Sequence, residues 1–340
     1  MKRLPNGVVR LRDVAVHAGV SPATVSRTLN GDPRVAPDLA HLVHVSVKEL
    51  GYRRNQLARN LRRQRADAIG IVVSDLENPH FSEMVGVAEE EGFRLGLRVL
   101  VCGTNESAEK QATYLQMMGD DRVAGVILSP SDPAGPEIGL LLDQGIPVVA
   151  FDREVADPRA DTVIADNVGG VADATRLMIE NGHKAIAFVG GRRGVETADE
   201  RLAGYRQAMR AAKLKPIVAA ADFRIEGGRL AVQRLLQSAT PPTAVIVANN
   251  LMTLGALKAA RDGGRRIPDD LALVGVDDPY WAEFVNPSIT SLAQPVRAMA
   301  HEALSMLRDR LAGPVASPRR SVHALELRVR SSSGGQVQRS

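Results

Sequence analysis

The stretch LRDVAVHAGVSPATVSRTLNGDPRV, residues 11–35, decides the fold of the first part of this 340-residue chain. Its first eight residues place apolar side chains at positions i, i+3, i+4 and i+7, which form one face of a short helix. Gly19 then breaks that helix. Ser21 can cap a second helix, and Pro22 suits its first turn. The stretch therefore predicts two short helices joined by a tight turn.

The spacing within this stretch is that of a helix-turn-helix motif. Counted from Leu11, Ala15 is fifth, Gly19 ninth and Val25 fifteenth. The small Ala15 lets the second helix approach closely, Gly19 permits the tight turn, and Val25 fills the wedge between the helices. The alternative is a small helical domain with a coincidental turn. The three matching positions, the basic charge and the N-terminal location favour the DNA-binding motif.

A third helix is predicted from Pro37 to Leu50, with Gly51 as its stop. Ala36 has no side-chain oxygen with which to cap it. The exposed face of the second helix carries short side chains and one arginine, which suits insertion into the major groove of DNA. The candidate DNA contacts in this region are Ser21, Pro22, Ala23, Thr24, Ser26, Arg27 and Asn30.

Charge divides the chain into two parts. Residues 1–65 hold 13 Lys and Arg against 4 Asp and Glu, a net charge of +9, and the rest of the chain holds 30 against 35, a net charge of −5. A basic end on a mildly acidic body indicates that this end meets a polyanion. The alternative, a basic tail, is weakened because the basic end is predicted to have its own fold.

From Ala68 onward, apolar runs bounded by turns alternate with amphipathic segments. The apolar runs are residues 69–73, 99–101, 123–128, 148–151, 186–189, 245–248 and 271–276, and helical patterns include 81–95, 167–180, 201–212 and 251–261. This alternation indicates parallel sheets covered by helices on both faces. Seven or so such units exceed one compact sheet, so two lobes are expected. The tail at residues 331–340 is small and polar, and is expected to be disordered.

Composition argues against several other classes. The single cysteine, Cys102, allows no intrachain disulfide. The N-terminus has no apolar stretch behind its charges, and no run approaches the roughly 18 apolar residues of a membrane helix, so a cytoplasmic protein without a membrane partner is expected. The glycine-rich turn at residues 189–194 lacks the nucleotide-loop spacing, and neither a zinc pattern nor a nucleophile elbow is found. We therefore expect no enzyme activity, no cofactor and no metal.

Residues 11–35 resemble the head-piece of the lactose-repressor/purine-repressor family. The resemblance continues through KELGYRRNQLARNLR (residues 48–62) and into body segments such as IGIVVSDLENPHFSE (69–83), GIPVVAFDRE (145–154) and VGVDDPYWAEFVNPSITSLAQP (274–295). It covers about residues 10–330 in unbroken order. It implies an all-α helix-turn-helix head-piece and an α/β body of two doubly wound parallel-sheet lobes, like a periplasmic binding protein. The implied function is sequence-specific, effector-controlled transcriptional regulation, most simply repression.

The resemblance also assigns a role to the basic segment after the third helix. In this family that segment is a hinge helix that orders on operator DNA, and a leucine from each of two paired hinges enters the minor groove. That leucine matches Leu61, and the same segment would bring Asn55, Ala58 and Arg59 to the DNA. The alternative is that Leu57 and Leu61, four residues apart, pack on the body or on each other.

The resemblance places effector-binding residues at strand ends and helix starts of the body, where ligands sit in doubly wound sheets. Arg201 matches the ligand-contacting arginine of the family. Its planar guanidinium can donate two parallel hydrogen bonds to vicinal hydroxyls or to a carboxylate. The alternative for each polar residue is a helix cap, and for each aromatic residue a place in a lobe core. The family's common Asn-Asp pair reads Asn249-Asn250 here, a change expected to retune the cleft. The candidates are Asp75, His80, Phe81, Asp152, Arg201, Phe223, Asn249, Asp277 and Trp281.

The expected domains are a helix-turn-helix domain at residues 1–53, a hinge at 54–66 and an effector-binding, dimerising body at 67–330. Lobe 1 would take about residues 67–165 and 293–320, and lobe 2 about 166–292 and 321–330, with a crossing near Ser321. One head-piece covers only a half-site, so a homodimer on pseudo-palindromic double-stranded operator DNA is expected, with a tetramer left open. The expected effector is a sugar or sugar derivative, either inducer or co-repressor.

Two other classes were weighed against this one. A solute-binding transport protein would need a signal sequence and would lack the helix-turn-helix. An α/β enzyme fused to a DNA-binding head would need a nucleophile–base pair or a cofactor loop. Turnover of a candidate ligand would favour the enzyme.

Overall fold

The computed structural model describes residues 9–29, 31–52 and 66–334, and the chain divides into two compact units, residues 1–64 and 65–340. The first unit consists of three helices, α1 (Leu11–Ala18), α2 (Pro22–Leu29) and α3 (Pro37–Leu50). Its small core contains Val14, Ala15, Val25 and Val43. Gly19 ends α1 with a φ of +66°, a backbone conformation that glycine adopts without steric cost. The predicted helix-turn-helix is therefore confirmed.

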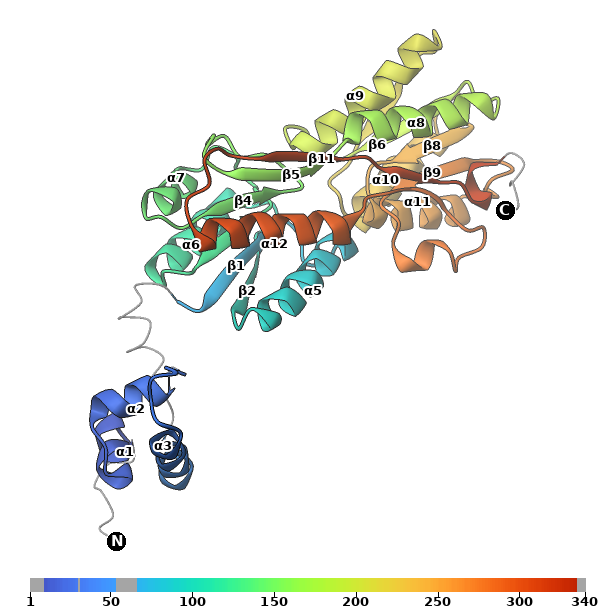
Figure 1. The fold of residues 1–340 in the computed structure, drawn as a ribbon. Coiled ribbons are helices and arrows are strands. Elements are labelled where there is room, and N and C mark those ends of the chain that lie inside the picture. Colours follow the sequence, from blue (N-terminus) through green and yellow to red (C-terminus); the bar gives the residue numbers. More distant parts are fainter. Residues whose placement is uncertain (1–8, 30, 53–65, 335–340) are drawn as a thin grey trace. The chain divides into compact units, whose positions relative to one another are not determined.

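The first lobe of the second unit is built on a six-stranded parallel sheet in the order β2-β1-β3-β4-β5-β11. Its strands are β1 (Ala68–Val73), β2 (Arg98–Gly103), β3 (Gly125–Leu128), β4 (Val148–Phe151), β5 (Asp161–Ala165) and β11 (Arg320–His323). Helices α5 (Pro79–Arg94) and α12 (Val296–Ala312) pack together on one face (Figure 1). Helices α6 (Ala108–Asp120) and α7 (Pro136–Asp143) cover the other face.

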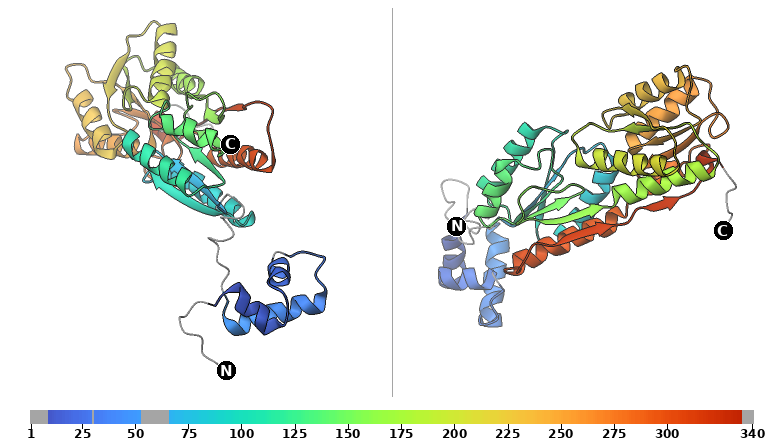
Figure 2. Two further views of the ribbon diagram at one scale, coloured as in Figure 1. Left: turned by 90° about the vertical axis from the view of Figure 1, so that its left-hand side faces the viewer. Right: turned by 90° about the horizontal axis from the view of Figure 1, so that it is seen from above.

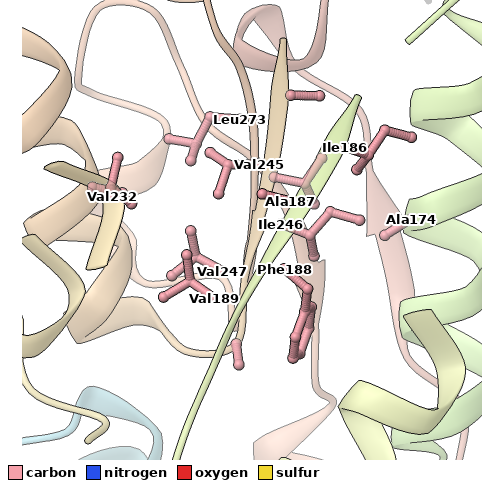
Figure 3. Close-up of a cluster of buried hydrophobic side chains, with 14 of the residues drawn as sticks. Ala174, Ile186, Ala187, Phe188, Val189, Val232, Val245, Ile246, Val247 and Leu273 are labelled. Carbon is pink, nitrogen blue, oxygen red and sulfur yellow. The ribbon is translucent and has the colours of Figure 1, made fainter. Parts of the chain in front are cut away.

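The second lobe repeats this architecture with the order β7-β6-β8-β9-β10-β12. Its strands are β6 (Ile186–Gly190), β7 (Ile217–Ala220), β8 (Ala244–Val247), β9 (Ala272–Val276), β10 (Thr290–Ala293) and β12 (Glu326–Arg328), of which β12 alone runs antiparallel to its neighbour. Its helices are α8 (Asn167–Glu180), α9 (Glu196–Ala211), α10 (Ile225–Leu236), α11 (Asn250–Asp262), and the short η1 (Tyr280–Ala282) and η2 (Ser331–Ser333). Fully apolar strands fill its core, as Figure 3 shows around Phe188 and Val247.

The C-terminal segment crosses from one lobe to the other, as the view from above in Figure 2 shows. The crossing falls after His323, slightly later than the expected Ser321, because β11 still pairs with β5 at that residue. Each end of the segment is anchored on an aspartate, which is buried in lobe 1 and half-buried in lobe 2. In lobe 1, Asp161 accepts hydrogen bonds of 2.7–2.8 Å from Arg310 and Arg319. The corresponding aspartate of lobe 2, Asp278, binds two arginines, Arg328 and Arg330.

The expectation of a disordered tail from residue 331 is wrong for its first residues. Ser332 and Ser333 are buried in η2. The Ser332 hydroxyl donates to the carbonyl of Leu273 at 2.7 Å and accepts from the amide of Thr290 at 2.8 Å. Small polar side chains are ordered here because the edge of the second sheet offers them backbone partners. Residues 335–340 lie outside the described residues.

The predicted fold class is confirmed in both units: an all-α helix-turn-helix head and a body of two doubly wound lobes. Both sheets have the strand order in which ligands bind beyond the carboxyl ends of the strands. In the described ranges, no helix is both long and apolar enough to cross a membrane.

Candidate ligand cleft and DNA-binding head

The two lobes enclose a cavity at the carboxyl ends of their strands. Eight of the nine candidate effector residues line it. They come from both lobes and are Asp75, His80, Phe81, Asp152, Arg201, Phe223, Asn249 and Asp277. The cavity offers only about 40 Å³ to the centres of water molecules, enough for roughly three of them. The lobes are therefore closed on each other in this structure.

Arg201 is held at the cavity by two neutral acceptors. Its Nε donates to Asn167 at 2.7 Å, and its Nη1 donates to the carbonyl of Ala248 at 2.7 Å. These bonds fix the plane of the guanidinium, and no hydrogen bond from its Nη2 is found among the described residues. A buried arginine with one donor nitrogen free can donate to a hydroxyl or carboxylate oxygen of a ligand.

Asp152 follows β4 and lies between two basic groups. Its carboxylate is 3.6 Å from His80 Nε2 and 3.5 Å from Arg153 Nε. Arg153 in turn binds Glu106 in a bidentate manner: its Nη1 and Nη2 each donate a 2.7 Å hydrogen bond to one carboxylate oxygen. Burial opposes the charge of Arg153, but the bonds to Glu106 raise its pKa above the usual value. Asp152 therefore keeps acceptor capacity that these two longer contacts leave unused.

Asp277 ties the end of β9 to the lobe crossing. One of its oxygens accepts from Gln294 at 2.7 Å, and the other accepts from the side chain of Asn250 at 3.2 Å. Asn250 also donates to Asn78 of the first lobe at 2.8 Å. A chain of hydrogen bonds thus crosses between the lobes along one wall of the cavity.

Asp75 takes part in a second contact between the lobes. The guanidinium of Arg224, in lobe 2, lies 3.2 Å from Asp75 and 3.2 Å from Glu77, both in lobe 1. Burial raises the pKa of Asp75, and a backbone hydrogen bond and the charge of Arg224 oppose that rise. A third contact joins the lobes where the amide of Glu154 donates to Glu196 at 2.8 Å.

The backbone at the cavity is unusual. Seven residues other than glycine have a positive φ in the described chain, and four of them line the cavity: Glu106, Asp152, Phe223 and Asp277, with φ between 60° and 71°. Side chains other than glycine pay a steric cost in this conformation. Such conformations cluster at functional sites, where they aim side chains that a regular strand end would point elsewhere.

Two candidates have structural roles. Asn249 caps α11, because its side chain accepts from the amide of Met252 at 2.9 Å and donates to the carbonyl of Phe223 at 3.0 Å. Asn249 still faces the cavity. Trp281 does not line the cavity in this structure, because η1 packs its indole against the core of lobe 2, and its role in effector binding stays a prediction.

Sequence reasoning missed several residues that line the cavity. The most important are Asn78, Arg153, Arg224 and Gln294. Gln294 directly follows β10, a strand that was not predicted from the sequence, so it lacked the signal that identified Asp152 and Asp277. Arg224 and Asn78 carry no such signal, because their roles come from partners in the other lobe.

The DNA-binding candidates lie on the second helix of the first unit. Ser21 caps α2 by accepting from the amide of Thr24 at 3.1 Å. Ser21, Pro22, Ala23 and Arg27 are exposed, and Thr24 and Ser26 are half-buried. This face is free to contact DNA. Asn30 and the hinge candidates Asn55, Ala58, Arg59 and Leu61 lie outside the described residues.

Comparison with known proteins gives the same result for both units. Residues 10–55 match the bacterial regulatory proteins of the lacI family, and residues 175–333 match a periplasmic binding protein-like domain. The chain is 36% identical to the HTH-type transcriptional regulator CelR of Thermobifida fusca, over 95% of this chain and 97% of that protein. It is 31% identical to the HTH-type transcriptional repressor PurR of Pectobacterium atrosepticum, over 93% of each.

Two solved structures are similar over nearly the whole chain. A complex of the transcriptional regulator CelR with cellobiose is 33% identical, with a TM-score of 0.72 over 95% of this chain and 99% of that one. The lac repressor dimer bound to operator and the anti-inducer ONPF is 26% identical, with a TM-score of 0.86 over 96% of this chain and 99% of that one.

A helix-turn-helix head followed by a two-lobed body defines a DNA-binding transcriptional regulator. The chain belongs to the lacI family of bacterial regulatory proteins.

Proposed function

We propose that this protein is a repressor that binds a pseudo-palindromic operator as a homodimer and is controlled by a sugar or sugar derivative bound between its lobes. The observation that carries the proposal is the convergence of eight buried or half-buried side chains from both lobes on one cavity. A ligand that contacts both lobes favours one arrangement of the lobes over others.

The chemistry of the cavity supports a polyhydroxylated effector. Asp152 and Arg201 offer an acceptor and a donor with spare hydrogen-bonding capacity, and Phe81 and Phe223 offer apolar ring surface. Sugars present hydroxyls at their edges and apolar C–H faces, which matches this combination. A similar structure is a complex of a regulator with cellobiose. Purines are the alternative class to test, because the sequence resembles a family that includes purine repressors.

Residues 1–53 would form the DNA-binding domain, residues 54–66 the hinge, and residues 67–330 the effector-binding body. The exposed face of α2 would enter the major groove, and Leu61 of each hinge would enter the minor groove. Effector binding would change the distance between the two hinges of a dimer, and so decide whether they order on DNA.

The homodimer is supported by exposed apolar side chains on the body. Phe93 of α5 is 81% exposed. Strand β2 is one edge of the first sheet and exposes Val101. Large exposed apolar side chains and an unpaired strand edge are typical of surfaces that pair with another chain. A tetramer would need a further surface.

We also propose that the protein acts in the cytoplasm, without a cofactor, and releases its effector unchanged. The support is that the similar proteins described above are transcription regulators. Incubation of the protein with each ligand that binds, followed by chromatography of the ligand, tests this point.

The test of the proposal is a selection of duplexes from a random pool by the full-length chain. The expected consensus has two half-sites related by a two-fold axis. Fluorescence anisotropy on that consensus, repeated with sugars, sugar acids, nucleosides and purines, should then identify a sugar that changes the operator affinity. A monomer at micromolar concentration with undiminished operator affinity would contradict the dimer. A response to purines alone would contradict the sugar.

A further inference from the structure

A second cavity adjoins the cleft and is much larger. It offers about 390 Å³ to the centres of water molecules, against about 40 Å³ in the cleft. The start of α5, the residues after β9 and the crossing before α12 form its walls, with Glu83, Tyr280 and Val296 among its lining residues. His80, Asp277 and Gln294 line both cavities, so the two spaces meet at these three side chains.

The two cavities suit different parts of a ligand. Ligand pockets are commonly about 300–1,000 Å³ in volume, so the second cavity is already large enough for a sugar ring. The cleft must widen before it admits one. A ligand that occupied only the cleft would leave the larger, preformed space to water.

Unsatisfied polar atoms gather around the two cavities. In the described part of the chain, eight buried side-chain nitrogen or oxygen atoms lack a hydrogen-bond partner, and six of them belong to residues that line one or both cavities. They include both ring nitrogens of His80, Oδ1 of Asn250 and Oε1 of Gln294. Buried polar groups are normally paired, and these three residues offer both donors and acceptors to a ligand at the junction.

The charge of the second cavity limits what it can hold. Its described lining residues include Glu83, Asp277 and Asp278 and no lysine or arginine. Asp278 is already paired with Arg328 and Arg330, whereas Glu83 is exposed and has no ion pair among the described residues. A phosphate or carboxylate group would find no cationic partner there. Tyr280, which is 80% exposed at the rim, can cover the apolar face of a sugar ring.

We propose that the second cavity is a second sugar subsite, so that the effector is an uncharged glycoside of at least two rings. One ring lies in the cleft beside Arg201 and Asp152. The glycosidic link passes His80 and Gln294, and the second ring packs against Tyr280 and Val296. This inference rests on the proposed function, since it assumes that the cleft binds a sugar.

The test compares pairs of sugars on the full-length chain by isothermal titration calorimetry. The probes are glucose with cellobiose and maltose, galactose with lactose, and a 6′-phosphorylated form of any disaccharide that binds. We expect one disaccharide to bind at least tenfold more tightly than its monosaccharides, and its phosphorylated form to bind more weakly. The single tryptophan, Trp281, lies next to Tyr280, and its fluorescence should change with the disaccharide.

Variants separate the second subsite from the cleft. Tyr280→Ala should weaken disaccharide binding about five- to tenfold and leave monosaccharide binding unchanged. Val296→Phe, which fills the cavity, should act in the same way. Phe284→Ala is the matched control, because this ring is equally exposed on the same segment but does not line the cavity.

The outcomes distinguish this inference from the proposed function. If a monosaccharide binds as tightly as its disaccharides, or if Tyr280→Ala weakens both equally, the second subsite is overturned and the proposed sugar effector stands. If no sugar binds, both the proposed sugar effector and the proposed second subsite are overturned. Operator binding would remain in either case.

Discussion

The side-chain amide of Asn250 in the second lobe donates a 2.8 Å hydrogen bond to the side-chain oxygen of Asn78 in the first lobe. Both residues are buried. The Asn78 oxygen also accepts from the amide of His80 at 3.0 Å, so it caps α5 and holds the opposite lobe at once. By the resemblance described above, Asn250 stands where the family commonly has Asp. An amide donor at this position therefore links the lobes directly at the cavity wall.

Replacing that donor by an acid should open the cleft. Asn250→Asp would place a carboxylate against the Asn78 oxygen and beside the carboxylate of Asp277, with no donor between them. We expect the closed arrangement to lose about 2–3 kcal/mol relative to an open one. Small-angle X-ray scattering of the full chain should give a larger radius of gyration for the variant.

The control for this change is Asn181→Asp. Asn181 donates to the carbonyls of Ser333 and Gly334 within lobe 2, away from the cleft, so the same chemical change there should leave the scattering curve as it is. Identical radii of gyration for Asn250→Asp and the parent protein would show that the Asn250–Asn78 bond does not hold the lobes together.

The strands that the sequence predicted and those that it did not predict differ in a physical way. Six of the seven predicted strands are apolar and buried, and the seventh, β2, is an apolar strand at a sheet edge. The edge strands β11 and β12 carry few apolar residues, and β7 is apolar but short and half-exposed. β10 is buried, but half of its residues are Thr and Ser. β5 begins with Asp161, whose buried charge is balanced by Arg310 and Arg319 about 150 residues later. Such long-range pairing leaves no local signal.

The cleft was predictable for the same reason that the central strands were. Asp152 and Asp277 directly follow apolar strands, and the topology brings such strand ends together. Trp281 does not line the cavity, because proximity in sequence to Asp277 does not fix the direction of a side chain in a short helix. Arg224 and Asn78 depend on the approach of the other lobe, which only the folded structure supplies.

Acid should weaken the first lobe through Asp161. Burial alone would raise the pKa of this carboxyl, but hydrogen bonds from Arg310 and Arg319 outweigh burial and lower it to about 2. Because the folded pKa lies below the usual 3.8, the stabilisation is fully present above pH 4 and is lost as the pH falls toward 2. The lowered pKa of Asp161 therefore contributes about 2 kcal/mol to the free energy of unfolding at neutral pH.

Asp161→Asn tests this account by thermal unfolding between pH 7 and pH 2.5. We expect a loss of about 3 kcal/mol at pH 7, because two partly buried arginines lose their counter-charge, and a shallower fall of Tm below pH 4. Asp143→Asn is the control, because Asp143 pairs with Arg159 on the surface and should contribute less than about 1 kcal/mol. If the Tm of Asp161→Asn falls below pH 4 as steeply as the Tm of the parent protein, Asp161 does not cause the loss of stability in acid.

Arg27 should contribute to operator recognition without contributing to the fold. Its side chain is exposed at the end of α2, and no ion pair to it is found among the described residues. Arg27→Ala should lower the affinity for the selected operator by about 1–3 kcal/mol and leave Tm unchanged. The matched change Arg12→Ala, an exposed arginine on α1, should affect operator and random duplex alike. If Arg27→Ala and Arg12→Ala lower the affinity for the operator and for the random duplex by the same factor, Arg27 contacts only phosphates.

Leu61 should discriminate specific from nonspecific DNA. It lies outside the described residues, so the prediction rests on the hinge resemblance and on the physics of side chains that wedge between base steps. A leucine inserted into the minor groove stabilises only a duplex that is already held in register, and random DNA bound through phosphates does not benefit. Leu61→Ala should therefore weaken operator binding at least tenfold and leave random-duplex binding within about twofold, both measured by fluorescence anisotropy at one salt concentration.

Leu57→Ala is the comparison. If these leucines instead pack on the body or on each other, both variants will lower Tm and reduce binding to the two duplexes by equal factors.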